Sequence, residues 1–160
     1  MLSLLSVPEP VVERAAAWFG SLTPATLAEI ADWYASDARF KDPFQEVRGL
    51  IGIRAIYAHM FEVLEAPQFL IRQRIHQGEQ TVLLWDFKFG IRFRNKVIAQ
   101  SIHGATHLTW AQHGGEWRIQ DHRDYWDTAE ELYEKWPLFG AVLRFMKRRM
   151  ATPQEQAQKI

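Results

Sequence analysis

The sequence contains no cysteine, which excludes disulfides, thiolate nucleophiles and metal sites built on cysteine ligands. It also has no excess charge, because 19 Lys and Arg residues balance 19 Asp and Glu residues, and a neutral chain has no long-range attraction for nucleic acid or anionic lipid. Its apolar runs, including the one in residues 1–7, are too short for a signal peptide or for the roughly 18 residues of a membrane-spanning helix. These absences predict a cytoplasmic protein that binds neither nucleic acid nor a membrane.

Motifs for cofactors and metals are also missing. The sequence has no glycine-rich phosphate loop and no Gly-x-Ser-x-Gly elbow, which argues against nucleotide binding and serine hydrolysis. His103 and His107 are four residues apart in an expected strand, hence roughly 13 Å apart on one face, too far to bind one metal ion together. We therefore expect no cofactor and no metal site.

The periodicity of apolar residues changes once along the chain. Helical spacing covers residues 11–20 and 50–64, and Thr23 and Pro24 begin a further helix between them. That helix is expected to carry Leu27, Ile30, Ala31 and Tyr34 on one face. From residue 69 the spacing becomes strand-like over residues 69–75, 81–93, 97–110 and 116–126, with short turns between. The predicted fold class is α+β, with N-terminal helices packed on a curved antiparallel sheet.

The C-terminal residues predict a helical extension over residues 128–150. Apolar residues recur there at steps of three and four, at Leu132, Trp136, Phe139, Leu143 and Met146. The seam that they form must either cover another apolar face or make an interface. We treat residues 1–160 as a single domain with a core of about residues 9–127.

Two segments place acidic residues where chemistry could occur. Asp42 precedes Pro43 in a turn between an extended stretch and a helix, and Asp124 lies near the end of the last expected strand. Asp before Pro also commonly fixes a turn through its own side chain. Both interpretations of Asp42, as a base at a pocket rim and as a turn residue, stay open at this point.

Alternation along the expected strand 81–93 separates polar from aromatic side chains. Asp86 and Lys88 share one face with Leu84, and Trp85, Phe87 and Phe89 share the other. The structural interpretation makes Asp86, Lys88 and Asp124 the solvated side of a half-buried sheet. The functional interpretation directs them into a pocket instead.

The order of these segments resembles the family that includes nuclear transport factor 2, SnoaL-type polyketide cyclases, ketosteroid isomerase and limonene epoxide hydrolase. The resemblance covers about residues 11–127 and is carried by residues 33–40, Asp42-Pro43, Gly49 before a helix, and four strands. It implies a cone-shaped fold of the nuclear transport factor 2 type, which would be a single SnoaL-like domain with a pocket inside the cone.

Two family members imply roles for particular residues. In the ketosteroid isomerase pattern the Asp of Asp-Pro is a general base, which matches Asp42, while the two oxyanion donors fall near Trp18 and Thr106 and are replaced here. The epoxide hydrolase pattern Arg-Asp-Tyr-Phe-Asp matches residues 123–127 with one aromatic exchange, so Asp124 would activate water. Its Arg-x-Asp pair corresponds to Asp86 and Lys88 in reversed order.

The resemblance implies a catalytic group of four residues that point into the cone: Asp42, Asp86, Lys88 and Asp124. Carboxyl groups gathered in an apolar pocket acquire different pKa values, so that one can act as acid and another as base. The expected ligand-binding wall consists of Trp18, Phe40, Phe44, Met60, Leu84, His122 and Trp126. Such a wall suits a small hydrophobic molecule.

The predicted function is therefore a cofactor-independent acid–base enzyme, an isomerase, cyclase or hydratase/hydrolase, acting on a hydrophobic substrate. Two alternatives stay open: a non-catalytic binder of a small apolar ligand, and an adaptor whose output is a protein contact. The face with Trp85, Phe87 and Phe89 is too aromatic to leave in water. We expect it to pair two copies of the chain as a homodimer, or else to be covered by the C-terminal seam.

Overall fold

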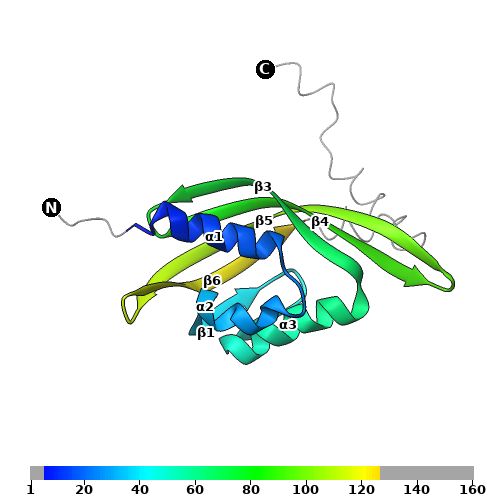
Figure 1. Cartoon of the computed structure of the whole chain (residues 1–160), viewed down its shortest axis with the longest axis horizontal. Coiled ribbons are helices and arrows are strands. Elements are labelled where there is room, and N and C mark those ends of the chain that lie inside the picture. Colours follow the sequence, from blue (N-terminus) through cyan, green and yellow to red (C-terminus); the bar gives the residue numbers. More distant parts are fainter. Residues whose placement is uncertain (1–5, 127–160) are drawn as a thin grey trace, which may run out of the picture. The chain divides into compact units, whose positions relative to one another are not determined.

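The computed structural model describes residues 6–126, in which the helices lie on one face of a six-stranded sheet (Figure 1). Helix α1 (Glu9–Gly20) follows Pro8 and has a proline in its first turn, where the missing N–H costs no helical hydrogen bond. It buries Val12, Trp18 and Phe19 and packs against β3 (Glu65–Gln77). The α+β class is confirmed, and the cone shape stays a prediction.

The second helix is shorter than its apolar spacing predicted. A 3₁₀ turn, η1 (Thr26–Glu29), leads into the single-turn helix α2 (Ile30–Trp33). Tyr34 opens strand β1 (Tyr34–Lys41) instead of lying on a helix, and Ala31 is exposed. The expectation for these two residues was wrong because Tyr34 pairs with Ile119 of the last strand, and tertiary pairing outweighs local helical periodicity.

The sheet is mixed. Strands β3, β4 (Gln80–Phe93), β5 (Lys96–His113) and β6 (Glu116–Trp126) form the predicted antiparallel meander. Strand β1 adds to β6 in parallel, and β2 (Glu46–Arg48) continues the edge, so the order is β2-β1-β6-β5-β4-β3. The purely antiparallel sheet was therefore wrong at this edge. Helix α3 (Gly49–Val63) lies against β1.

The register decides which side chains face the helices. Leu83 pairs with Thr106, and Thr106 pairs with Asp124, so these three residues share one face. On the same face of β4, Trp85, Phe87 and Phe89 are 3%, 9% and 8% exposed. The aromatic face therefore belongs to the core of the chain. The expectation that this face is free was wrong, because an apolar sheet face packs against the helices of its own chain. The homodimer itself stays a prediction.

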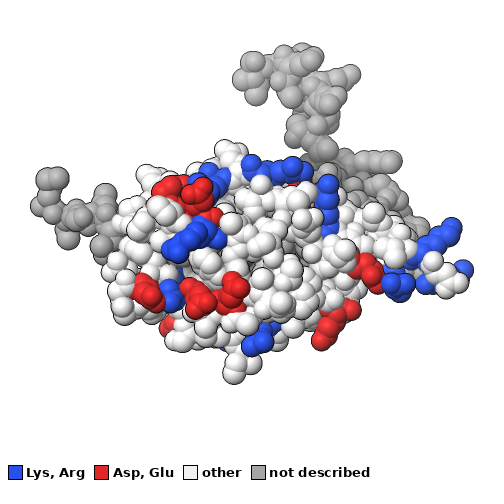
Figure 2. Space-filling view, viewed as in Figure 1, with Lys and Arg blue, Asp and Glu red and all other residues white. Residues whose placement is uncertain are grey.

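The surface carries both signs of charge. Figure 2 shows basic and acidic side chains interspersed over one face of the molecule, consistent with the balance of charges in the sequence. Among the helices in residues 6–126, none is long and apolar enough to cross a membrane. The predicted C-terminal extension over residues 128–150 lies outside the described residues, and a cytoplasmic location stays a prediction.

Candidate functional site

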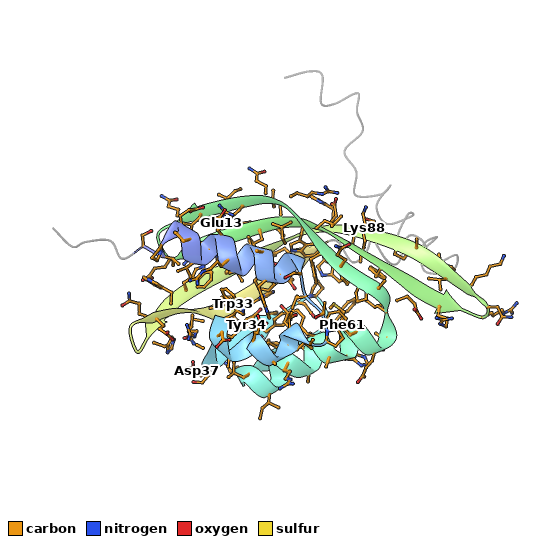
Figure 3. The ribbon with its side chains drawn as sticks, in the orientation of Figure 1. Glu13, Trp33, Tyr34, Asp37, Phe61 and Lys88 are labelled. Atoms are coloured by element: carbon orange, nitrogen blue, oxygen red, sulfur yellow. The ribbon has the colours of Figure 1, made fainter. Side chains whose placement is uncertain are left out.

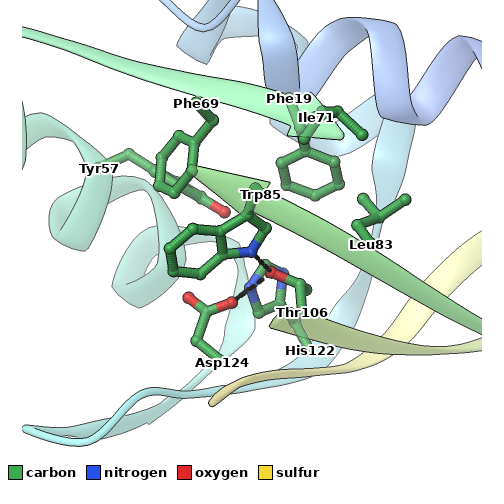
Figure 4. A pocket seen from close by; sticks show the side chains of 9 residues that line it. All are labelled: Phe19, Tyr57, Phe69, Ile71, Leu83, Trp85, Thr106, His122 and Asp124. Atoms are coloured by element: carbon green, nitrogen blue, oxygen red, sulfur yellow. Dashed lines mark hydrogen bonds and ion pairs between the residues drawn. The ribbon is translucent and has the colours of Figure 1, made fainter. Parts of the chain in front are cut away.

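A small pocket lies between the helices and the inner face of the sheet (Figure 4). Its volume is about 10 Å³, enough for roughly one water molecule. The walls combine aromatic and aliphatic side chains with four polar groups, and the lining residues are Phe19, Tyr57, Phe69, Ile71, Leu83, Trp85, Thr106, His122 and Asp124. The polar groups come from α3, β5 and β6, which meet here because of the register described above.

Asp124 is held firmly by one of its two oxygens. Its Oδ1 accepts the hydroxyl of Thr106 at 2.5 Å and lies 2.9 Å from Nε2 of His122. The Thr106 oxygen in turn accepts the indole N–H of Trp85 at 2.8 Å. Among the described residues no hydrogen bond reaches Oδ2, and the Asp124 side chain is 14% exposed. The pocket therefore presents a carboxyl group with one fixed oxygen and one free oxygen.

His122 connects this carboxyl group to two buried tyrosines. Its side chain is 2% exposed, and its Nδ1 lies 2.8 Å from the hydroxyl of Tyr34. The Tyr34 hydroxyl lies 3.0 Å from that of Tyr57, which reaches in from α3. The ring of Phe40 stacks on the imidazole at 4.4 Å between centroids. Four polar side chains thus form one continuous line of hydrogen bonds.

Both tyrosines are neutral hydroxyl groups under ordinary conditions. Burial is the main cause that raises the pKa of Tyr34, and contact with Tyr57 adds to it. Burial also raises the pKa of Tyr57 well above its ordinary value, followed by the charges of Asp124 and, more weakly, Asp42. The hydrogen bond with Tyr34 acts in the opposite direction on Tyr57. Neither phenol is therefore a candidate for a phenolate nucleophile near neutral pH.

The site offers acid–base chemistry. A carboxylate beside an imidazole, with hydroxyl donors nearby, has the groups that proton transfer requires. Within residues 6–126, no three His, Asp or Glu side chains gather as metal ligands would.

Comparison with known proteins identifies the family of the chain. The family model for the SnoaL-like domain matches residues 15–123, which is most of the described part of the chain. The chain belongs to the SnoaL-like family. No curated protein matches the sequence.

Solved structures show the fold of this SnoaL-like chain. A protein of Shewanella denitrificans described as a SnoaL-like polyketide cyclase is 18% identical, with a TM-score of 0.64 over 78% of this chain and 98% of its own. A hypothetical protein of Catenulispora acidiphila that has a ketosteroid isomerase-like fold, solved in complex with trimethylamine, is 20% identical, with a TM-score of 0.59 over 79% of this chain and 92% of its own. TsrD of Streptomyces laurentii is 15% identical, with a TM-score of 0.62 over 85% and 99%.

The structure does not bring the four predicted catalytic residues of the SnoaL-like pocket together. Asp86 lies on the outer face of the sheet, where it accepts from Arg72 at 2.7 Å and lies 2.9 Å from Nδ1 of His103. These contacts, with the hydrogen bond to His103 first, lower the pKa of Asp86. Lys88 is exposed on the same face (Figure 3). The expectation that both point inward was wrong, because the aromatic residues that alternate with them, Trp85, Phe87 and Phe89, occupy the inner face.

Asp42 fixes a turn. Its Oδ1 accepts the backbone N–H groups of Phe44 and Gln45 at 2.7 and 2.8 Å, the arrangement expected of an Asp that precedes proline. Its charge still acts on Tyr57, so Asp42 lies within electrostatic range of the site without lining the pocket. The structure thus supports the turn interpretation.

The predicted wall residues lie at varying distances from the pocket. His122 lines it, and Phe40 stacks on His122 from behind. Trp18 is buried against Tyr57, with ring centroids 6.4 Å apart. The others are displaced: Phe44 is 58% exposed and packs on Trp126, Leu84 is on the outer face, and Met60 is half-buried on α3.

The sequence analysis missed the tyrosines and placed Trp85 on the wrong side. One signal was available for Tyr57 and one for Trp85. Tyr57 follows the buried Ile53 by four residues on α3, and a buried tyrosine usually requires a partner for its hydroxyl group. Trp85, Phe87 and Phe89 form the more apolar face of their strand, which belongs in the core. The bond between Tyr34 and His122 joins residues 88 positions apart and left no local pattern.

Proposed function

We propose that this SnoaL-like protein is a cofactor-independent acid–base enzyme in which Asp124 removes a proton from a small apolar substrate. The observation that carries the proposal is the free Oδ2 of Asp124 in an otherwise mostly apolar pocket. A carboxylate whose position is fixed by hydrogen bonds at one oxygen can accept a proton at the other. Asp42, with its oxygen engaged by two turn amides, takes no part in this transfer.

Proton removal next to a carbonyl group is the reaction class that suits the site best. It is common to isomerases and cyclases, and it requires a base together with donors near the carbonyl oxygen. The neutral hydroxyl group of Tyr57 lines the same pocket as Asp124. The polyketide cyclase description of a solved structure with the same fold supports a substrate rich in carbonyl groups.

Entry of such a substrate requires the pocket to widen. The volume of about 10 Å³ is far below the about 300–1,000 Å³ of an ordinary ligand site. Phe69 and Ile71 of β3 are half-buried wall residues, and rotation of their side chains would enlarge the pocket. We therefore expect small ketones to be better first probes than large ones.

Exchange of hydrogen for deuterium tests the proposal. The full chain is incubated in D₂O with 2-tetralone, an apolar ketone with acidic protons beside its carbonyl group, and loss of the proton signal is followed by NMR. The exchange rate with the wild type should exceed the rate in buffer alone, and the rate with Asp124→Asn should equal the rate in buffer. The melting temperature of Asp124→Asn should stay within a few degrees of that of the wild type. Asp37→Asn, which changes a carboxylate on the surface, is the matched control and should keep the wild-type rate.

A non-catalytic binder is the second candidate, and the aromatic wall of Phe19, Phe69 and Trp85 favours it. Such a wall attracts an apolar ligand whether or not a reaction follows. If wild type and Asp124→Asn exchange 2-tetralone equally, the enzyme proposal is wrong. Native mass spectrometry that then finds an unchanged small molecule on the purified protein would support the binder. The adaptor alternative loses its aromatic face, which is buried, and its second contact segment lies outside the described residues.

A further inference from the structure

We propose that Tyr57 donates a proton to the substrate oxygen and that His122 supplies this proton through Tyr34. The inference rests on the proposed function, because it adds the acid to the base assigned to Asp124. Tyr57, His122 and Asp124 line the pocket, whereas Tyr34 connects two of them from β1. Tyr57 is accordingly a catalytic residue in this proposal, and Tyr34 a relay residue behind it.

The contacts form an unbroken path. Oxygen to oxygen, Tyr57 and Tyr34 are 3.0 Å apart. The Tyr34 oxygen is 2.8 Å from Nδ1 of His122, and Nε2 of His122 is 2.9 Å from Oδ1 of Asp124. Every distance is within the range of a hydrogen bond. In Figure 4 the Tyr57 hydroxyl group points toward the side of the pocket that holds Trp85 and His122.

The carboxylate fixes the direction of the hydrogen bonds. An ionised Asp124 can only accept, so Nε2 of His122 carries a proton. When the imidazole is neutral, Nδ1 is an acceptor, Tyr34 donates to it, and Tyr57 donates to Tyr34. The hydroxyl proton of Tyr57 then lies in the hydrogen bond to Tyr34. In this state the Tyr57 oxygen can accept a hydrogen bond from a substrate but cannot donate one.

Protonation of His122 reverses the whole path. Nδ1 now donates to Tyr34, Tyr34 donates to Tyr57, and the hydroxyl proton of Tyr57 is free to point into the pocket. The imidazolium lies beside the Asp124 carboxylate, which compensates its charge. The state that presents a donor to the substrate is therefore the imidazolium–carboxylate pair.

The reaction step balances in this state. Asp124 Oδ2 takes a proton from the carbon beside the carbonyl group, and the C–H electron pair forms the new C=C bond of an enol. The π bond of the carbonyl group breaks, and its electron pair moves to the oxygen. The carbonyl oxygen takes the proton of Tyr57, which takes that of Tyr34, which takes that of His122 at Nδ1. The step begins with an imidazolium and a carboxylate and ends with a neutral imidazole and a carboxylic acid. No oxidant, reductant or further reactant is required.

Within residues 6–126, Asp124 is the charged side chain that bonds to His122. The elements around the ring contribute Phe19 of α1 and Phe40 of β1, which contact it with uncharged rings. Tyr34 of β1 is the titratable group that bonds to it on the other side, and Tyr57 of α3 follows. Burial raises the pKa of both phenols, which keeps the relay hydroxyl groups protonated. The state of the relay thus depends on the imidazole and Asp124.

Variants of the two tyrosines test the relay through the exchange of 2-tetralone. Tyr57→Phe should lower kcat by about 10²–10³-fold, as loss of an oxyanion donor does, with a smaller change in KM. Tyr34→Phe keeps the hydroxyl group of Tyr57 but breaks the path. Its kcat should fall, and its pH profile should lose the limb at which His122 deprotonates in the wild type. Tyr125→Phe, at an exposed tyrosine, is the control and should match the wild type.

Nitrogen NMR of the histidine side chains gives a readout that does not need activity. The relay requires neutral His122 to carry its proton on Nε2, and the pH at which His122 titrates should coincide with the limb of the kcat profile. A neutral His122 protonated on Nδ1 would overturn the relay whatever the enzyme does. The relay would also be overturned if both tyrosine variants kept the wild-type kcat and the wild-type pH profile of kcat. If Asp124→Asn alone abolishes exchange, the proposed function stands without the relay, whereas equal exchange by wild type and Asp124→Asn removes the proposed function itself.

Discussion

Thr106 joins a buried indole to the carboxyl group of the pocket. Its oxygen accepts from Trp85 and its hydroxyl proton goes to Asp124, so its single hydroxyl group satisfies one neighbour and orients the other. Thr81 makes a similar bond to Trp110, at 3.0 Å, outside the pocket. The two threonines separate the structural effect of such a bond from its effect on Asp124.

We expect Thr106→Val and Thr81→Val each to lower the free energy of unfolding by about 1–3 kcal/mol, because each leaves a buried indole N–H without an acceptor. Thr106→Val should also lower the exchange kcat by about tenfold, since Asp124 loses one of the two bonds that position it. Urea unfolding and the 2-tetralone assay measure the two effects. Equal exchange rates in both variants would mean that Thr106 only stabilises the fold.

At the level of residues, the sequence could identify Asp124 and His122 but not the group to which they belong. Both lie in residues 121–127, which contain three Asp residues and therefore stand out in the sequence. Tyr34 reaches His122 only because β1 pairs in parallel with β6, a long-range event without local signal. Asp86 and Lys88 were misplaced because alternation gives two faces and does not say which one is inside.

At the level of elements, Gly104 allows β5 to approach Trp85. A Cβ atom at position 104 would collide with the outer edge of the indole ring, because Trp85 pairs directly with Gly104 across the two strands. The Trp85 ring therefore occupies the space that a side chain at position 104 would fill, while its N–H donates to Thr106. Glycine here serves a close approach and not a turn.

We expect Gly104→Ala to cost about 1–3 kcal/mol of stability through overpacking. The cost should be smaller in a Trp85→Phe background, because the shorter ring removes the atoms that the methyl group would meet. A double-mutant cycle from urea unfolding measures the coupling. Additive effects of the two substitutions would show that Trp85 is not the neighbour that resists the methyl group.

Elements with strong periodicity were predictable, and short ones were not. Helix α3 and the four strands of the meander appear within a few residues of their predicted ranges, because each repeats its pattern several times. The segment 23–34 offered only a turn or two of helical spacing and became a 3₁₀ turn, one turn of α-helix and the start of β1. Pairing with β6 provided the information that the segment itself lacked.

At the level of the whole molecule, the buried tyrosines make the free energy of unfolding fall at alkaline pH. The folded-state pKa values of Tyr34 and Tyr57 are raised, mainly by burial, above the value of about 10 of an unfolded chain. Above that pH the unfolded state releases two protons that the folded state keeps. The stability that these groups contribute is therefore present below pH of about 10 and is lost as the pH rises.

Each of the two tyrosines should remove about 1.4 kcal/mol of unfolding free energy per pH unit once the unfolded phenols are ionised and the folded ones are not. The double variant Tyr34→Phe with Tyr57→Phe should lose this part of the slope, although its stability at neutral pH falls because His122 loses a buried hydrogen bond. Urea unfolding between pH 9 and about 11, followed by circular dichroism, measures both slopes. Tyr125→Phe, at the exposed position, is the control and should keep the wild-type slope of unfolding free energy against pH. If the double variant also keeps that slope, the two buried phenols ionise within the folded protein and the prediction is wrong.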